Sequence, residues 1–204
     1  MKYAYINGII LDGSEDMVPQ KGKVILTEND KILGIVDKDT DLNTYQKIDL
    51  KGKYIMPGLI NLHVHLPGSG KPVKEGVDNG ERIKKLAKNP IVLIAIKKIC
   101  EKYAKMELMS GVTTIRTVGG AKNYDTEIRN KINAGKMIGP RVLASNYAIS
   151  VPDGHMAGSL AYIANSADEA VQYVRKIAED HPDLIKLMIT GGVLDAKAKG
   201  EPGE

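Results

Sequence analysis

A pair of histidines stands at the end of an apolar segment. The motif His63-Val64-His65 follows the apolar stretch 55–60. On a β-strand, residues i and i+2 face the same side, so both imidazoles are predicted to project together from the end of a strand. Two imidazoles in this position could share a divalent metal ion. A chance pair that forms hydrogen bonds in a loop is the alternative, and the place at the end of an apolar strand favours the metal site.

Lys186 is the only charged residue in the apolar segment 184–189. In a strand, Lys186 would share one face with Leu184 and Met188, and that face would point to the interior of the fold. Desolvation disfavours the ammonium form of a buried lysine. The neutral amine could then act as a nucleophile, form a Schiff base, or add carbon dioxide to give a carbamate that bridges two metal ions. The alternative is an ion pair with a carboxylate such as Asp153 or Asp195.

Two further side chains are candidates for substrate contact. His155 lies in the glycine-containing loop 151–158, where it could contact a substrate or a metal, or be an ordinary polar loop residue. Arg116 is the only long charged residue of the predicted strand 112–118. It could bind an anionic substrate or form an ion pair inside the sheet.

Two double-glycine segments follow predicted strands, at residues 119–120 and 191–192. Their backbone amides could approach a phosphate group, although neither a P-loop nor a dinucleotide-binding fingerprint is present. A phosphate-binding module is therefore one alternative function. Cys100 has helical spacing from Ile96 and Tyr103, which predicts a core residue rather than a nucleophile.

The elements that must position these residues fall into two parts. In residues 1–53, turn signals separate short predicted strands at 2–6, 9–11, 23–27, 31–36 and 47–50. Asn7-Gly8 predicts a hairpin between the first two strands, because this dipeptide supplies the positive φ angles of a tight turn. From residue 54 onward, strands at 54–65, 112–118, 141–146 and 184–189 alternate with helices at 90–109, 125–134 and 166–179. Ser166 and Glu169 form a capping box for the last helix.

This alternation indicates an α/β fold with a parallel sheet. The carboxyl ends of the strands, where such folds place their chemistry, carry the candidate residues. An open doubly wound sheet and a (β/α)8 barrel both fit the pattern.

Composition excludes several classes of protein. The chain has 204 residues, 43% hydrophobic and 26% charged, which excludes wholesale disorder. Its net charge of +4 is scattered and no aromatic platform accompanies it, so no nucleic-acid partner is expected. The single cysteine fits a reducing compartment. Neither a signal peptide nor an apolar stretch of about 18 residues is present, so a cytoplasmic protein without membrane contact is expected.

The segment Lys51–His65 closely resembles the opening of the amidohydrolase superfamily, in which a Pro-Gly and a His-x-His motif join a small β domain to the first barrel strand. Gly111–Arg116 resembles the second strand of that family. The surroundings of Lys186 are similar to those of the fourth-strand lysine in its binuclear members. The nearest subgroup is the prolidase-like and imidazolonepropionase-like enzymes.

The resemblance implies a small β-sandwich-type domain at 1–53 and the first four strands of a (β/α)8 TIM barrel at 54–204. It implies that His63 and His65 bind the more buried of two metal ions, and that Lys186, as a carbamate, bridges both. The ions would be zinc, manganese or cobalt. Metal-activated water would hydrolyse an amide, dipeptide-like or cyclic amide C–N bond, with His155 and Arg116 on the substrate side.

The family has further ligands after strands five and six, and an acid/base Asp after strand eight, none of which the chain contains. A barrel typically takes about 250 residues. The sequence therefore predicts the N-terminal half of an amidohydrolase, with no complete catalytic set and no activity by itself. Its unpaired strand edges predict association with a second copy or with the missing half. The alternative function is a non-catalytic scaffold or interaction domain that keeps the fold.

Overall fold

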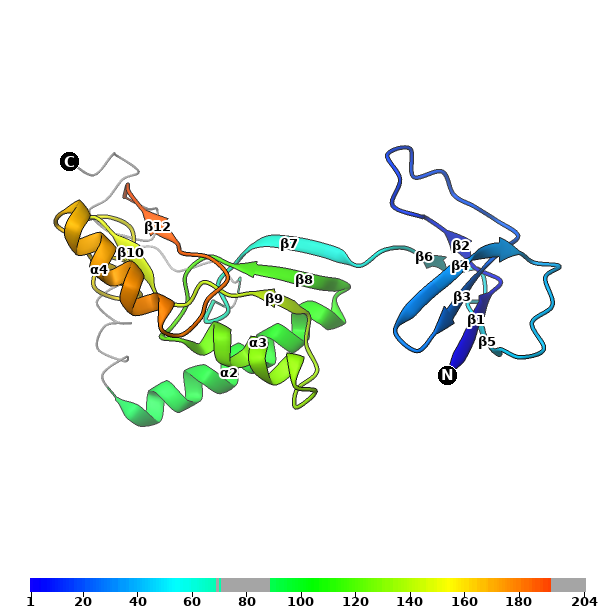
Figure 1. Cartoon of the computed structure of the whole chain (residues 1–204), viewed down its shortest axis with the longest axis horizontal. Coiled ribbons are helices and arrows are strands. Elements are labelled where there is room, and N and C mark those ends of the chain that lie inside the picture. The colour runs from blue at the N-terminus through cyan, green and yellow to red at the C-terminus, as the bar shows by residue number, and fades with distance from the viewer. Residues whose placement is uncertain (69, 71–88, 192–204) are drawn as a thin grey trace. The chain divides into compact units, whose positions relative to one another are not determined.

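The computed structural model describes residues 1–68, 70 and 89–191 (Figure 1). The chain divides into two compact units, Met1–Gly58 and Leu59–Glu204. The sequence places this boundary after residue 53. The first unit reaches Gly58 because β6 (Tyr54–Ile55) pairs in parallel with β2 (Ile9–Ile10).

The first unit is built on a four-stranded sheet of order β4-β3-β1-β5. Its strands are β1 (Lys2–Ile6), β3 (Lys23–Glu28), β4 (Lys31–Asp37) and β5 (Gln46–Asp49). β3 pairs antiparallel with β4, and Asn29 lies in the left-handed region at the turn between them. Its core is formed by Ala4, Val24, Leu26 and Leu42.

The predicted hairpin around Asn7-Gly8 is wrong. β1 pairs antiparallel with β3 and parallel with β5, whereas β2 pairs with β6. Asn7 does adopt a positive φ of 56°. Gly8 packs against the Leu50 side chain, and the chain passes there from the sheet that contains β1 to the pair formed by β2 and β6. The turn signal was correct, but it joins two sheets instead of two paired strands.

The second unit contains two three-stranded parallel sheets, as the alternation of strands and helices predicts. The first has the order β7 (Leu59–Val64), β8 (Val112–Thr117), β9 (Arg141–Leu143). The second has the order β11 (Ala161–Ile163), β10 (Ala148–Ser150), β12 (Leu187–Met188). The segment 141–150 links them, since its first half pairs with β8 and its second half with β12.

The strands of this unit differ from expectation in three ways. The strand expected at 141–146 stops at Leu143 and resumes as β10, because residues 144–147 form side-chain and loop hydrogen bonds in place of a ladder. β11 was not anticipated, since only three residues form it. The last strand is shortened to Leu187–Met188.

Two helices cover one face of the first sheet (Figure 1). They are α2 (Pro90–Met109) and α3 (Tyr124–Asn133). The core beneath them includes Val64, Cys100, Ile115, Ile128 and Val142. Cys100 is fully buried, as predicted, and burial raises the pKa of its thiol to about 12.

The third helix, α4 (Ala167–Ala178), packs on β10 through Ile177. Its expected start is confirmed, because the Ser166 hydroxyl accepts a hydrogen bond from the Glu169 amide at 3.2 Å. The Glu169 carboxylate accepts from the Asn165 amide at 2.8 Å, one residue earlier than a capping box requires. None of the helices within the described residues is long and apolar enough to cross a membrane.

Candidate metal centre

His63 and His65 come together at the end of β7. Val64, between them, is buried in the core under the helices, so strand alternation directs both histidines to the opposite face. Their Nε2 atoms lie 3.2 Å apart, and the ring centroids are separated by 5.1 Å. The two rings thus project to one side of β7, as the spacing of i and i+2 predicts.

The Nε2 separation fits two ligands of one small divalent ion. Imidazole nitrogens at about 2.0–2.1 Å from a tetrahedral zinc ion lie about 3.3 Å from each other. In addition, Nδ1 of His65 lies 2.9 Å from the carbonyl oxygen of Gly119. A carbonyl can only accept, so Nδ1 carries the proton and the Nε2 lone pair is available to a metal.

Electrostatics show which other groups surround His65. Burial is the main cause that lowers the pKa of His65, while the Gly119 carbonyl opposes this effect. Positive charge on His63, Lys186 and His155 lowers this pKa further. His63, Lys186 and His155 therefore lie close enough to His65 for their charge to act on it. The neutral imidazole, which a low pKa favours, is the form that binds metals.

Lys186 reaches this region from the residue before β12. Its carbonyl accepts from the Ile149 amide at 3.0 Å, which places it beside β10. Within the described residues Lys186 forms no ion pair, so Asp153 is not its partner, and Asp195 lies outside those residues. His155 joins from the loop after β10, where its amide donates to the Thr190 carbonyl at 2.9 Å.

Two histidines alone are an incomplete ligand set. In residues 1–68, 70 and 89–191, no group of three or more His, Cys, Asp or Glu side chains could hold a metal ion. A carbamate on Lys186 would add an anionic oxygen donor beside the two imidazoles. This mixed nitrogen and oxygen set suits zinc, manganese or cobalt.

Arg116 makes a backbone contact near the histidines. Its Nε donates to the Leu62 carbonyl at 2.8 Å. The register of β7 on β8 shifts at this point: Asn61 lies opposite Ile115, and Val64 lies opposite Thr117. Arg116 therefore braces the irregular part of β7 that carries His63, a contact that the sequence did not indicate.

The double-glycine segment at 119–120 does not offer free amides to a phosphate. The Gly119 amide donates to the Ser145 hydroxyl at 2.7 Å, and the Gly120 amide donates to the Asn146 carbonyl at 2.8 Å. Both donors are thus committed to the protein, which weighs against the phosphate-binding alternative. Of the second segment, Gly192 lies outside the described residues.

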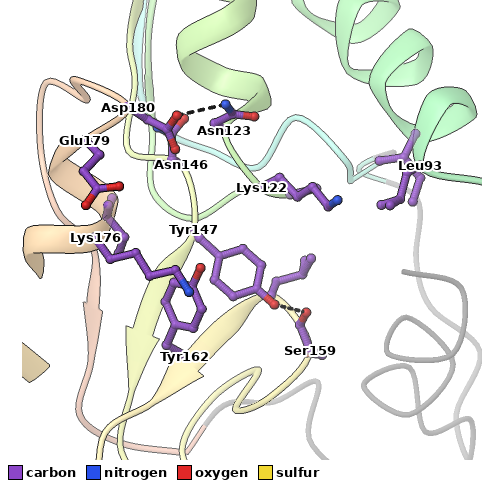
Figure 2. A pocket seen from close by; sticks show the side chains of 14 residues that line it. Leu93, Lys122, Asn123, Asn146, Tyr147, Ser159, Tyr162, Lys176, Glu179 and Asp180 are labelled. Carbon is purple, nitrogen blue, oxygen red and sulfur yellow. Dashed lines mark hydrogen bonds between the residues drawn. The ribbon is translucent and has the colours of Figure 1, made fainter. Parts of the chain in front are cut away.

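The described residues of this unit line a cavity beside the histidines and a second one away from them. One, of about 500 Å³, is lined by His63 and His65 together with Tyr103, Met106 and Glu107 of α2. The other, of about 480 Å³, is shown in Figure 2. Its wall includes Tyr147, which donates to the Ser159 carbonyl, and Lys176, whose ammonium lies 4.7 Å from the Tyr162 ring centroid. This second cavity is separate from the candidate metal centre, because its lining does not include His63, His65, His155 or Lys186.

Comparison with protein families decides the lineage of this centre. Residues 54–202, well over half of the chain, match the model of the Amidohydrolase family. The chain belongs to the amidohydrolase family. It thus comes from a family of hydrolytic enzymes that are generally metal-dependent.

Individual amidohydrolase relatives match shorter stretches of sequence. A 5-methylthioadenosine/S-adenosylhomocysteine deaminase of Bacillus thuringiensis (strain Al Hakam) is 35% identical over 68 residues, 32% of this chain and 16% of that protein. A dihydroorotase of Aquifex aeolicus (strain VF5) is 37% identical over 82 residues, 40% of this chain and 19% of that protein.

Solved structures match almost the whole chain. The crystal structure of an amidohydrolase is similar with a TM-score of 0.79 and 28% identity, over 99% of this chain and 50% of that one. A Xaa-Pro dipeptidase with bound methionine has a TM-score of 0.79 at 24% identity, over 100% of this chain and 51% of that one, a likeness of fold. The chain spans about half the length of these solved structures.

Proposed function

We propose that this amidohydrolase chain supplies the first ligands of a binuclear metal site that hydrolyses a C–N bond in a small-molecule amide, dipeptide-like or cyclic. The observation that carries the proposal is the pair of Nε2 atoms 3.2 Å apart, one on a histidine whose Nδ1 is bound to a carbonyl. Divalent ions would supply Lewis acidity and a water of lowered pKa there.

The residues of this chain have distinct roles in the proposal. His63 and His65 hold an ion through Nε2. Lys186 would lose its ammonium proton and add carbon dioxide through Nζ, forming an N–C bond and releasing a second proton, and the resulting carbamate would offer its oxygens as further ligands to the divalent ions. His155 lies on the substrate side. Arg116 donates from Nε to the Leu62 carbonyl, and its remaining guanidinium nitrogens would bind an anionic group of the substrate.

The described residues do not complete this chemistry. No described carboxylate completes a group of three metal ligands with the two histidines, and the chain covers only about half of the solved structures it resembles. We therefore propose that the 204-residue chain is inactive alone and that the first barrel strands, in residues 54–204, need further strands. The small β domain at 1–53 precedes them.

Exposed strand edges support a protein partner. Within the described sheets, β7 and β12 are edge strands. They expose large apolar side chains: Leu59 (52%), Ile60 (63%), Leu62 (51%), Leu187 (54%) and, next to β12, Ile189 (69%). A second copy of the chain or the remaining half of the barrel would cover them. The same edges favour the second candidate function, a non-catalytic interaction domain.

Zinc titration of the full chain tests the proposal. We expect stoichiometric zinc binding that is lost in the His63→Ala/His65→Ala double variant. The matched control is His181→Asn, because His181 lies outside the centre and Asn tolerates its positive φ of 50°. Equal binding by the double variant, or no stoichiometric zinc in the wild type, would sink the metal site and leave the interaction domain as the function.

A further inference from the structure

A buried polar network lies directly behind His65. It is formed by Thr117 at the end of β8, Asp125 and Thr126 in the first turn of α3, and Ser145 and Asn146 between β9 and β10. Each of these residues is at most 2% exposed. Polar groups so deeply buried are costly unless they are hydrogen-bonded, so the arrangement of their partners is informative.

The network holds one peptide unit from two sides. The Gly120 amide donates to the Asn146 carbonyl at 2.8 Å. The Gly119 carbonyl belongs to the same planar peptide and points the opposite way, to Nδ1 of His65 at 2.9 Å. The preceding amide, that of Gly119, donates to the Ser145 hydroxyl at 2.7 Å. Gly119 has a φ of 114°, which a residue with a side chain rarely adopts.

Ser145 and Asn146 are themselves anchored. The Ser145 amide donates to Thr117 Oγ1 at 2.9 Å. The Asn146 amide donates to Asp125 Oδ2 at 3.1 Å, and its side-chain oxygen accepts from the Thr126 amide at 3.1 Å. The direction of the Gly119 carbonyl therefore depends on β8 and α3, which anchor residues 145–146 in the segment that links the two sheets.

We propose that Ser145 is a positioning residue for His65. Its hydroxyl oxygen accepts from the Gly119 amide and fixes the backbone at Gly119, so that the Gly119 carbonyl keeps His65 in the Nδ1–H tautomer with the Nε2 lone pair directed toward His63. The other neutral tautomer carries its proton on Nε2 and cannot bind a metal there. The consequence for metal binding rests on the proposed function, whereas the tautomer is a property of the chain without metal.

Long-range nitrogen NMR of the metal-free full chain tests this role, since it distinguishes the two imidazole tautomers. At about pH 8 neutral imidazole predominates. We expect His65 of the wild type to be predominantly Nδ1–H, and Ser145→Ala to move it toward the Nε2–H form. The matched control is Ser159→Ala, because Ser159 is also buried and its hydroxyl donates to the Met156 carbonyl at 2.9 Å, away from Gly119.

Zinc affinity is measured separately on the same variants. Loss of a group that orients a metal ligand typically costs about 10–100-fold in affinity, and we expect a loss in this range for Ser145→Ala only. An unchanged His65 tautomer in Ser145→Ala, or an Nε2–H tautomer in the wild type, overturns the positioning role. Absence of zinc binding in the wild type overturns the proposed function, while the spectra still decide the role of Ser145.

A second variant covers the case in which Ser145→Ala does not fold. Thr117→Val keeps the volume of Thr117 but removes the oxygen that accepts from the Ser145 amide. Circular dichroism establishes that it is folded. The same change of the His65 tautomer is then expected, and an unchanged tautomer contradicts the proposal.

Discussion

Asp125 makes the stability of the second unit depend on pH. Its side chain is fully buried at the start of α3. Oδ2 accepts from the Asn146 amide at 3.1 Å, but Oδ1 finds no partner among the described residues. Burial raises the pKa of Asp125 from 3.8 to about 6, although the nearby Thr117 hydroxyl and the Asn146 amide partly oppose this shift.

The sign and size of the effect follow from linkage. Because the folded pKa lies above the unfolded one, ionisation favours the unfolded chain. The contribution of Asp125 to stability is therefore greatest below pH 3.8, falls as the pH rises through about 6, and is nearly constant above about pH 7. At 1.36 kcal/mol per pKa unit, the fall amounts to about 3 kcal/mol.

The variant Asp125→Asn isolates this contribution, because the amide keeps the shape and cannot ionise. We expect the free energy of unfolding of Asp125→Asn to rise by about 3 kcal/mol relative to that of the wild type between about pH 3 and about pH 7. Urea unfolding at a series of pH values measures this difference. The helical circular dichroism signal is suitable because all helices of the described residues lie in the second unit.

The control variant is Asp183→Asn, for which the opposite sign is expected. Burial would raise the pKa of Asp183, but the Ala144 amide and Arg129 outweigh it and lower this pKa. Here the free energy of unfolding of the wild type should rise relative to that of Asp183→Asn as the pH rises through the range in which the Asp183 carboxyl ionises. A difference for Asp125→Asn that is flat or reversed over this range would refute the reasoning about burial.

Two further predictions concern packing and capping in the same unit. Ile128→Ala removes a fully buried side chain of α3 and should lower the free energy of unfolding in urea by about 2–5 kcal/mol. The control Val171→Ala, at a position 48% exposed, should change this free energy by less than about 0.5 kcal/mol. Equal effects would contradict the assigned core. Ser166→Ala removes the cap of α4 and should cost about 1 kcal/mol in thermal or urea unfolding, while Ser166→Asp should retain most of the stability. A neutral Ser166→Ala would mean that packing alone holds the helix start.

Local sequence patterns determined the helices and the direction of the histidine pair. The spacing of apolar residues predicted 90–109, and α2 occupies Pro90–Met109. Alternation around Val64 was enough to direct His63 and His65 to one side, because a buried residue in a strand sends both neighbours to the other face. Such patterns depend on residues close in the chain, which the sequence presents directly.

Tertiary structure alone decided which segments meet. Asn7-Gly8 signals a turn correctly, yet pairing of β2 with β6 makes it a crossing between sheets. The bond from His65 to Gly119 joins residues 54 positions apart. Ser145 was an ordinary residue in the sequence, and its place behind His65 depends on the order and register of three strands. Residue types set local backbone conformation and the buried face, whereas contacts between distant segments arise only when the whole unit packs.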